Sequence, residues 1–407
     1  MDRTVSVVGL GYIGLPTALL LADAGVSVAG FDLDEEKCAA LQDDQLYFEE
    51  PGLPELFASV RAKGTFRAGA LQAADVYLVA VPTPTHAGKA DLRYVLSALE
   101  SIQPLAKTGD LIIIESTIGP RDCAETLIPT IEAWPAQVHF AHCTERAIPG
   151  STLHEMVHND RIVGGHGPEA TRIATELYAR FVRGRIFPTD PTTAAVCKVM
   201  ENTYRAVNIA LANEFAQLAE TYEFDIWEAI ELTNKHPRVQ VHSPGPGVGG
   251  HCIPIDPYFF LDGTERSALI QRSLAINESM PQYVASEVRT LIAEHSIEKP
   301  VICLLGYAYK KNVDDARETP AAQLAENLAS CGPILLSDPH VKRPGIHDTD
   351  NALCQANVVV LVTDHDEYRG LDFAKYPNVR LIYDTRNALR HDPSLGNAHL
   401  YTLGKGR

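Results

Sequence analysis

The sequence predicts an α/β protein in which two doubly wound domains are joined by a central helical region with one long helix. Three observations predict this fold. Short apolar strand patterns alternate with helical segments near the N-terminus, a long helical pattern follows from about residue 191, and strand patterns resume at Pro300. Because strands that alternate with helices pair in parallel, helices should cover both faces of each sheet. A length of 407 residues is compatible with two or three domains.

The N-terminal region opens with a strand, a helix and a strand. Thr4–Leu10 predicts the first strand, Gly14–Ala24 a buried helix, and Val26–Asp32 the second strand. Further buried strands are expected at Asp75–Val81, Asp110–Ser116 and Gln137–Cys143. This pattern predicts a first domain over residues 1–190.

The central region, residues 191–297, has a helical pattern. Thr192–Tyr222 contains no glycine or proline and predicts one long helix. A second helical segment, Ala268–Glu294, should be interrupted near Pro281, because proline removes a backbone donor. A long helix between two α/β regions suits both a connector and a subunit interface, so we expect a homodimer formed through it.

Strand patterns return in the C-terminal region, residues 298–407, and predict a second, smaller α/β domain. A helix is expected at Ala321–Ala329. The expected strands are Val301–Gly306, Pro333–Pro339, Asn357–Asp364 and Val379–Thr385.

Charge and cysteine usage limit the function classes. The formal net charge of −17 disfavours nucleic-acid binding, since phosphate contacts require a surplus of Lys and Arg. The eight cysteines have no paired spacing, which favours reduced thiols and a cytoplasmic location. The apolar runs are shorter than the roughly 20 residues of a membrane span, so no membrane partner is expected. No metal site is expected either.

The clearest motif is VVGLGYIG, in which Gly9, Gly11 and Gly14 have the spacing GxGxxG between a strand and a helix. Such glycines permit a tight turn, close approach of the backbone to a pyrophosphate, and close packing of helix on strand. Asp32 ends the second strand, where a carboxylate accepts hydrogen bonds from the ribose hydroxyls and repels a 2′-phosphate. The sequence therefore predicts a Rossmann-type domain that binds NAD.

Four other residues are expected in the same cofactor site. Tyr12 and Ile13 lie inside the motif. Thr83 and Thr117 follow two later strands, and the carboxyl ends of parallel strands border the binding crevice of such a sheet.

A second motif, PGPGVGGHCIPIDP, holds Cys252 and Asp256 on backbone restricted by glycine and proline. A thiol in a polar loop needs a modest decrease of its pKa, ordinarily about 8.5, to supply thiolate. With NAD, such a thiol can capture an aldehyde as a thiohemiacetal, which is oxidised to a thioester and hydrolysed. A small core residue is the alternative for Cys252, and a turn or cap residue for Asp256.

Three polar residues of the long helix, Lys198, Asn202 and Arg205, lie at i, i+4 and i+7 and share one helix face. In a largely buried helix, an amine and an amide can polarise an oxyanion or position water. A solvated stripe is the alternative.

Five ordered motifs together resemble the UDP-glucose/GDP-mannose dehydrogenase family over nearly the whole chain. They are VVGLGYIGLP at the start, TERAIPG (Thr144–Gly150), KVMENTYRAVN (Lys198–Asn208), GGHCIPIDP (Gly249–Pro257) and GYAYKKNVDDARETP (Gly306–Pro320). The resemblance implies an N-terminal NAD-binding Rossmann domain, a central dimerisation and catalytic region, and a C-terminal Rossmann-like domain that binds the UDP-sugar. It also implies an NAD-dependent nucleotide-sugar 6-dehydrogenase that oxidises a C6 alcohol to the acid and reduces two NAD per turnover.

The resemblance also implies catalytic roles by position. The matching residues are Cys252 for the nucleophile, Lys198 and Asn202 for a lysine and asparagine pair, Asp256 for an acidic helper, and Glu145 for a glutamate after the sixth strand. Lys198 would stabilise an alkoxide or oxyanion, while Asn202 and Thr117 would hold oxygen or water. Glu145 would assist the attack of water on the thioester.

Further residues are expected to bind the substrate or the cofactor. By the same resemblance, Arg238 takes a substrate-contacting position, and Lys310 and Arg317 address the nucleotide sugar or the cofactor. The remaining substrate-site residues are expected to be Glu145, Arg146, Lys198, Asn202, Arg205 and Gly249. Surface ion pairs are the alternative for the charged side chains.

The motifs also bear on which sugar is oxidised. HPRV, PGPGVGGHC and Glu145–Gly165 are most similar to the subgroup that acts on UDP-N-acetyl-D-mannosamine, whereas KKNVDDARETP and TDHD also resemble UDP-N-acetylglucosamine 6-dehydrogenases. Thr144 stands where the subgroup usually has proline, so UDP-N-acetylglucosamine and UDP-glucose stay as alternatives. A single-step dehydrogenase of the β-hydroxyacid type, which would not need Cys252, and a non-catalytic nucleotide-binding regulator are more remote alternatives.

Overall fold

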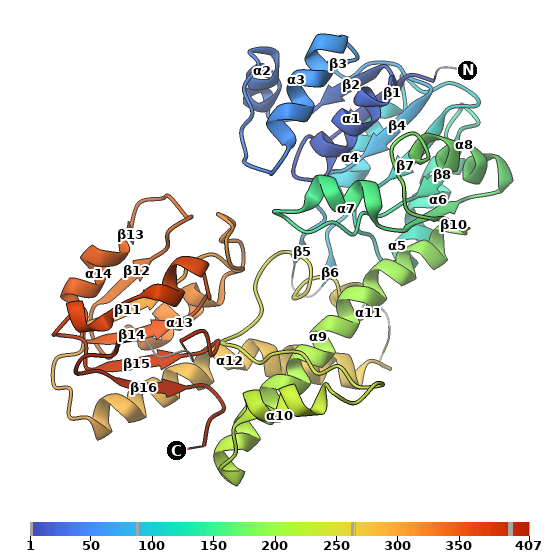
Figure 1. The fold of residues 1–407 in the computed structure, drawn as a ribbon. Coiled ribbons are helices and arrows are strands. Elements are labelled where there is room, and N and C mark those ends of the chain that lie inside the picture. Colours follow the sequence, from blue (N-terminus) through green and yellow to red (C-terminus); the bar gives the residue numbers. More distant parts are fainter. Residues whose placement is uncertain (1–2, 87–88, 262–263, 265, 390–393, 407) are drawn as a thin grey trace. The chain divides into compact units, whose positions relative to one another are not determined.

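A computed structural model describes residues 3–86, 89–261, 264, 266–389 and 394–406 of the chain. Figure 1 labels its helices and strands. The chain forms two compact units. The first comprises residues 1–201 and 258–264, and the second comprises residues 202–257 and 265–407.

The first unit is built on an eight-stranded sheet with the order β10-β9-β8-β7-β4-β1-β2-β3. Its strands are β1 (Val5–Val8), β2 (Val28–Phe31), β3 (Phe66–Ala68), β4 (Val76–Val79), β7 (Leu111–Ile114), β8 (His139–His142), β9 (Arg161–Gly165) and β10 (Ile186–Thr189). All neighbouring pairs are parallel except β8 and β9, which pair antiparallel. The parallel arrangement expected for the early strands is therefore confirmed, while β9 and β10 run in the opposite direction. A separate antiparallel pair is formed by β5 (Thr85–His86) and β6 (Lys89–Ala90).

Helices cover both faces of this sheet. Leu78 and Ile113 pack in one core with residues of α1, α3 and α8. The residues directly before them, Tyr77 and Ile112, pack in another core with residues of α4. Because successive side chains of a strand point to opposite faces, this division shows that the sheet is buried on both sides. The helices of the unit are α1 (Gly14–Asp23), α2 (Glu35–Gln42), α3 (Leu53–Lys63), α4 (Arg93–Ile102), α5 (Pro120–Asp122), the π-helix η1 (Cys123–Leu127), α6 (Ile128–Glu132), α7 (Thr152–His158), α8 (Pro168–Tyr178) and α11 (Tyr258–Leu261).

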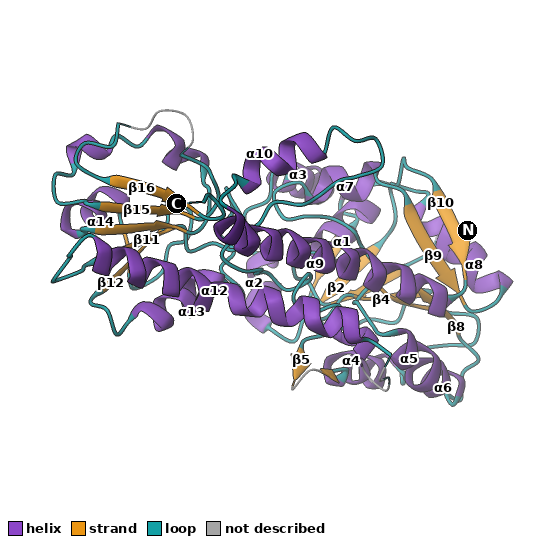
Figure 2. Ribbon diagram, turned by 90° about the horizontal axis from the view of Figure 1, so that it is seen from below, coloured by secondary structure: helices purple, strands orange, loops and turns teal. Residues whose placement is uncertain are grey.

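The second unit contains a six-stranded parallel sheet with the order β13-β12-β11-β14-β15-β16. The strands are β11 (Ile302–Leu305), β12 (Ile334–Ser337), β13 (Ile346–His347), β14 (Val358–Leu361), β15 (Leu381–Asp384) and β16 (His399–Thr402). Leu304 packs with residues of α12 and α13, and Leu305 packs with residues of α14 on the other side. In Figure 2, α12 and α13 follow one face of these strands. The remaining helices are α10 (Ile226–Thr233), α12 (Ala268–Glu294), α13 (Pro320–Leu328), α14 (Thr349–Gln355) and the 3₁₀ turns η2 (Asp366–Gly370) and η3 (Phe373–Lys375).

The long helix α9 (Pro191–Tyr222) confirms the predicted central helix. Its second half lies beside α12, as both views show, and the two are joined by buried amides. Asn213 donates to Asn277 Oδ1 over 3.0 Å, and Asn277 donates to the carbonyl oxygen of Ala206 over 2.9 Å.

The expected interruption of α12 near Pro281 is wrong, because the helix continues from residue 268 to residue 294. Proline removes one backbone donor, but the ring of Pro281 is buried and packs against Gly247. A Cβ atom at Gly247 would lie 3.3 Å from Cγ and Cδ of this ring. Packing between neighbours on both sides holds the helix together despite the lost hydrogen bond.

Among the described residues, none of the helices combines the length and the apolar character needed to cross a lipid bilayer.

Candidate active site

The predicted glycine motif forms a tight turn between β1 and α1. Gly9 has φ +93°, and a Cβ atom there would lie 2.5 Å from the carbonyl oxygen of Ala80, which follows the neighbouring strand β4. A Cβ atom at Gly14 would lie 1.9 Å from the carbonyl oxygen of Gly9. Within the described part of the chain, no heavy atom other than those of its chain neighbours lies within 4 Å of a Cβ built at Gly11. The turn therefore excludes side chains at two positions and leaves room beside Gly11, before the N-terminus of α1, that fits a pyrophosphate.

Asp32 follows β2 and faces the same turn. Its Oδ2 accepts hydrogen bonds from the backbone N–H of Leu10 at 2.8 Å and from Lys37 Nζ at 3.2 Å, and its Oδ1 accepts from the N–H of Asp34 at 3.0 Å. A carboxylate has about four acceptor positions, so capacity is left for a ribose hydroxyl. Tyr12 and Ile13 are partly exposed in the turn. These residues fit a dinucleotide.

Thr83 and Thr117 are both partly exposed and follow β4 and β7, which are adjacent in the sheet. The strand order also places β4 next to β1, so all three strands end at the same edge as Gly9. The structure thus brings both threonines to the expected edge of the sheet.

Glu145 belongs to a buried ionic network that the sequence did not predict. Arg161, at the start of β9, binds Glu145 Oε2 through Nη1 and Glu115 Oε1 through Nη2, each at 2.6 Å. Tyr178 donates to Glu115 at 2.7 Å, and Thr17 donates to its other oxygen at 3.1 Å. The guanidinium also lies 4.0 Å from the centre of the Tyr178 ring.

Two carboxylates share one guanidinium in this network, so its charges do not cancel. Burial raises the pKa of Glu115, and the lowering effect of Arg161 only partly offsets it, which leaves the pKa at about 7. Arg161 lies in the segment Glu145–Gly165 and Glu115 lies near the end of a predicted strand, but neither stands out from the sequence as a site residue. A charged residue opening a strand was the only available signal.

Lys198 fixes the backbone at the same place. Its Nζ donates to the carbonyl oxygen of Glu145 at 2.8 Å. The N–H of Arg146 donates to Glu145 Oε1 at 2.6 Å, while the Arg146 guanidinium pairs with Glu201. The structure therefore brings together three of the predicted substrate-site residues, Lys198, Glu145 and Arg146.

Cys252 differs from the core cysteines in its surroundings. It is partly exposed, and its carbonyl oxygen accepts hydrogen bonds from the N–H groups of Ile255 at 3.1 Å and Asp256 at 2.7 Å, so it begins a tight turn. Cys123, Cys143 and Cys303 are buried, and burial raises the pKa of each of these thiols to about 12. Cys252 is therefore among the more accessible thiols, which its proposed chemistry requires.

The loop before Cys252 is held from several sides. Asn213 Oδ1 on α9 accepts the N–H of Gly245 at 2.9 Å, and the carbonyl oxygen of Arg317 accepts the N–H of Gly250 at 3.0 Å. At Gly249, a Cβ atom would lie 2.7 Å from both the Glu318 carbonyl oxygen and Tyr309 Cβ. The glycines thus allow backbone to pack against backbone, which fixes the loop.

Asp256 is buried and accepts a hydrogen bond from Asn202 Nδ2 at 2.5 Å. This bond ties the turn of Cys252 to α9. The same helix carries Arg205, which is exposed.

Tyr309 lies close to several predicted site residues, although the sequence did not single it out. Its pKa is raised to about 12, mainly by burial and also by the charges of Asp315 and Cys252, while Arg317 and Arg205 act in the opposite direction. Arg317 is held by Asp315, with Nε 2.9 Å from Oδ1 and Nη2 2.5 Å from Oδ2. The charges of Cys252, Arg205 and Arg317 therefore all affect the pKa of Tyr309 in the second unit.

The other predicted residues of the second unit lie near its surface. Lys310 is partly exposed in the loop between β11 and α13. Arg238 is exposed in a segment whose backbone bends at His236, where Nδ1 accepts the Arg238 N–H at 3.3 Å. The predicted site residues of the first unit are Gly9, Gly11, Tyr12, Ile13, Gly14, Asp32, Thr83, Thr117, Glu145, Arg146 and Lys198, and those of the second are Asn202, Arg205, Arg238, Gly249, Cys252, Asp256, Lys310 and Arg317.

Comparison with known proteins identifies three domains of one family along the chain. Residues 3–182 match the NAD-binding domain of the UDP-glucose/GDP-mannose dehydrogenase family, residues 192–279 match its central domain, and residues 303–391 match its UDP-binding domain. The first of these matches contains β1 to β9, and the third contains β12 to β15 and most of β11.

Individual relatives cover almost the whole chain. The UDP-N-acetyl-D-mannosamine dehydrogenase of Methanococcus maripaludis is 40% identical over 404 residues, which cover 96% of this chain and 94% of that protein. The NDP-N-acetyl-D-galactosaminuronic acid dehydrogenase of Ralstonia nicotianae is 40% identical over 408 residues, which cover 94% and 96% of the two chains. The solved structure of a UDP-D-ManNAc dehydrogenase from Pyrococcus horikoshii is similar with a TM-score of 0.93 at 36% identity, and covers 99% of both chains. The chain therefore belongs to the UDP-glucose/GDP-mannose dehydrogenase family, and it is an NAD-dependent UDP-sugar dehydrogenase.

Proposed function

We propose that this protein oxidises the C6 hydroxyl of a UDP-N-acetylhexosamine to the uronic acid, with UDP-N-acetyl-D-mannosamine as the preferred substrate. The names of its relatives support this choice. Those from Methanococcus maripaludis and Pyrococcus horikoshii are named for N-acetylmannosamine, and the one from Ralstonia nicotianae for an N-acetylgalactosaminuronic acid. All three names contain an N-acetylated amino sugar, which favours this class over UDP-glucose.

The observation that carries the proposal is the partly exposed thiol of Cys252 at the start of a turn on a fixed loop. NAD, when bound, accepts a hydride in each of two oxidations. Between them, the sulfur of Cys252 adds to the C6 aldehyde, and the carbonyl oxygen takes up a proton to give a thiohemiacetal. Loss of the second hydride and a proton leaves a thioester, and water cleaves the carbon–sulfur bond to release the acid and the thiol. The C6 carbon thus gives up four electrons as two hydrides, and water supplies the second oxygen of the acid.

Other residues of this chain supply charge and protons for these steps. Lys198 stabilises the oxygen anion that forms at C6, and Asn202 and Thr117 orient oxygen or water. Glu145, held by Arg161, assists the attack of water on the thioester, and Asp256 orients Asn202 beside the turn of Cys252.

Basic side chains would bind the UDP group. Arg205 and Arg317 both act to lower the pKa of Tyr309. Lys310 lies in the same loop as Arg317. We assign these three residues, together with Arg238, Arg146 and the backbone at Gly249, to the UDP-sugar. Bidentate guanidinium groups suit a diphosphate, and the overall net charge of −17 makes such a local basic group notable.

We further propose that the protein is a homodimer formed through α9. This helix exposes a row of large apolar side chains, namely Met200, Tyr204, Leu211, Leu218 and Tyr222, with exposures between 40% and 71%. At 100° per residue these five positions fall within about 40° of one another, so they form one narrow stripe on one side of the helix. In a two-fold symmetric dimer, the stripe of one subunit would pack against the same stripe of a second copy, and both would be buried. The cytoplasmic location stays a prediction.

A substrate panel with complete product analysis tests the proposal. The enzyme is incubated with NAD and, in separate reactions, with UDP-N-acetylmannosamine, UDP-N-acetylglucosamine, UDP-N-acetylgalactosamine and UDP-glucose. We expect the highest kcat/KM for UDP-N-acetylmannosamine, with about two NADH formed per acid produced. One NADH per sugar with release of aldehyde would contradict the thioester route, and preference for UDP-glucose would contradict the proposed substrate class.

A further inference from the structure

The second unit repeats the Gly and Asp geometry of the first. Gly306 follows β11 and has φ +91°, close to the +93° of Gly9. A Cβ atom at Gly306 would lie 2.5 Å from Thr363 Cβ, which follows the adjacent strand β14. Asp338 follows β12 as Asp32 follows β2. Each carboxylate accepts the N–H of the residue after the glycine, at 2.6 Å in the second unit and 2.8 Å in the first. Both units therefore have the same arrangement, in which a positive-φ glycine is followed by an N–H that donates to an aspartate after the neighbouring strand.

The two carboxylates differ in what remains for a ligand. Asp338 Oδ2 accepts the N–H groups of Tyr307 at 2.6 Å and Ala308 at 2.7 Å, and Oδ1 accepts those of His340 at 2.8 Å and Val341 at 2.9 Å. Its side chain is 0% exposed, compared with 12% for Asp32. Asp338 is thus occupied by its own chain and has no capacity for a ribose hydroxyl.

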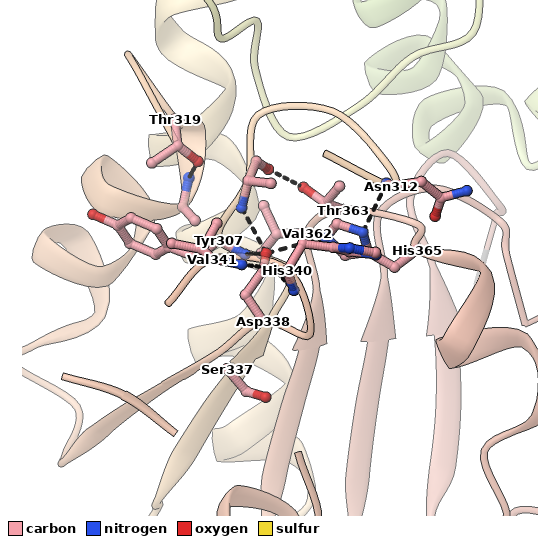
Figure 3. Close-up of polar contacts among 12 residues, drawn as sticks. Tyr307, Asn312, Thr319, Ser337, Asp338, His340, Val341, Val362, Thr363 and His365 are labelled. Atoms are coloured by element: carbon pink, nitrogen blue, oxygen red, sulfur yellow. Dashed lines mark hydrogen bonds and ion pairs between the residues drawn. The ribbon is translucent and has the colours of Figure 1, made fainter. Parts of the chain in front are cut away.

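His365 is a further hydrogen-bond partner of Asp338 and links this carboxylate to the loop that contains Asn312 (Figure 3). Its Nε2 lies 3.0 Å from Asp338 Oδ2, and the backbone N–H of Asn312 points at its Nδ1 over 2.9 Å. Because a backbone N–H can only donate, Nδ1 accepts, and the ring proton of the neutral imidazole is on Nε2, facing the carboxylate. Burial raises the pKa of Asp338, but the hydrogen bonds from His365 and from the backbone outweigh burial and lower it to about 2.

This arrangement also argues against a metal site. The ligand atoms of His340, His365 and Glu367 lie within 4.8 Å of one another. Both nitrogens of His365 already have protein partners, so a metal ion would have to displace one of them. The imidazole of His365 is used as a link between a carboxylate and a backbone amide.

The linked loop, residues 306–319, is fixed at separate points along its length. Thr363 donates to the carbonyl oxygen of Ala308 at 2.6 Å. Asn312 has φ +58°, and its amide and Asp366 exchange hydrogen bonds of 2.6 Å and 3.1 Å. Lys310 lies between the fixed positions 308 and 312, and Arg317 follows in the same loop.

We propose that His365, backed by Asp338, is a positioning residue that sets the β11–α13 loop for the diphosphate of the UDP-sugar. The inference rests on the proposed assignment of Lys310 and Arg317 to that substrate. The imidazole connects Asp338, which follows β12, to the backbone of Asn312, and Asn312 is two residues from Lys310. A loop with a positive-φ residue depends on such a tertiary contact, since a free loop would not favour this conformation.

Two substitutions separate the two hydrogen bonds of the ring. Asparagine in His365→Asn can place an oxygen near the position of Nδ1 and keep the bond from Asn312, whereas glutamine in His365→Gln can place its NH₂ group near Nε2 and keep the bond to Asp338. We expect His365→Gln to weaken binding of UDP about tenfold and to raise the KM of the UDP-sugar similarly, with the KM of NAD unchanged. His365→Asn should stay within about threefold of wild type.

Isothermal titration with UDP alone measures the effect without turnover, so it gives a result even if the proposed sugar is wrong. His340→Gln is the matched control, because that ring lies 4.9 Å from His365 but makes its bond to Asp338 only through the backbone. Wild-type UDP affinity in His365→Gln would overturn the proposal. Equal loss of UDP and NAD affinity in both His365 variants, with a lower melting temperature, would show a structural role only and would overturn it as well.

Discussion

Asn202 on α9 donates a hydrogen bond to the buried carboxylate of Asp256, and this contact joins the long helix to the turn that starts at Cys252. The two residues lie 54 positions apart in the chain, at a distance of 2.5 Å between Nδ2 and Oδ2. A buried polar group that loses its hydrogen-bond partner keeps its desolvation cost, and this applies to the carboxylate in Asn202→Ala and to the amide in Asp256→Ala. We therefore expect each substitution to cost about 1 to 3 kcal/mol of unfolding free energy.

A double-mutant cycle checks this coupling by denaturant unfolding of the two single variants and the double variant. Because the side chains are in contact, the double variant should lose less than the sum of the single losses, by about 1 kcal/mol or more. Strict additivity would show that the hydrogen bond contributes nothing to the folded state.

Replacing Cys252 tests the chemistry directly. Cys252→Ser keeps the size of the side chain but exchanges a thiol for a poorly ionised hydroxyl, so acid formation should decrease by about 10³-fold or more. Binding of NAD, followed by fluorescence or titration, should be unchanged. Cys354→Ser, at an exposed cysteine, is the matched control and should keep full activity. Normal acid formation by Cys252→Ser would remove this sulfur from the mechanism.

Much of the fold follows from local patterns in the sequence. The central strands β1, β4, β7, β11 and β14 are uniformly buried, and their apolar runs identify them. Strand β9 contains an arginine and two glycines, so its pairing depends on tertiary contacts that no local pattern contains. Pro281 misled the prediction for the same reason, since burial against Gly247 outweighs a local helix-breaking tendency.

The site divides in the same way. Motifs in the sequence predict the roles of Gly9, Gly11, Asp32 and Cys252. Arg161, Tyr309 and His365 lie within segments that carry the resemblance, but each acts with residues elsewhere in the chain, and the local sequence does not identify those partners.

The network around Arg161 predicts a large effect on stability. Arg161→Leu leaves Glu115 and Glu145 buried near each other without their shared cation, which should cost about 3 to 5 kcal/mol. Arg161→Lys keeps the charge but lacks the two-sided geometry, so it should fall between Arg161→Leu and wild type. Chemical denaturation measures the difference, and an unchanged unfolding midpoint in Arg161→Leu would contradict the importance of this network.

Glu115 gives the network a pH dependence with a definite sign. Its pKa rises from 4.5 to about 7 in the folded protein, mainly because of burial, so the folded state binds this proton more tightly than the unfolded state. The contribution of Glu115 protonation to the unfolding free energy is therefore full below about pH 4.5 and is lost as the pH rises through about 7. Glu115→Gln removes this titration. The unfolding free energy of the variant should fall less between pH 5 and pH 8 than that of wild type, and parallel curves would refute the assignment.

Asp32 should determine both affinity and choice of cofactor. Asp32→Ala removes the acceptor for Leu10 and for a ribose hydroxyl, so we expect NAD to bind about tenfold more weakly. Loss of the negative charge should also reduce discrimination against NADP, which carries a 2′-phosphate. The KM values for both cofactors measure this, with the KM of the UDP-sugar as the internal control. Unchanged NAD affinity would remove Asp32 from the ribose site.

The stripe on α9 predicts how the oligomer can be disrupted. Leu211 and Leu218 lie two turns apart on the helix and point to the same side, so Leu211→Glu combined with Leu218→Glu would place two charges per subunit in an apolar contact. Wild type should sediment as a dimer, and the double variant should dissociate at micromolar concentration, because burying unpaired charges costs several kcal/mol. Leu269→Glu, at an apolar residue that is 69% exposed outside the stripe, is the matched control and should stay dimeric. Circular dichroism of each variant verifies that α9 is still folded, and a dimer that persists with both glutamates in place would move the subunit contact to another surface.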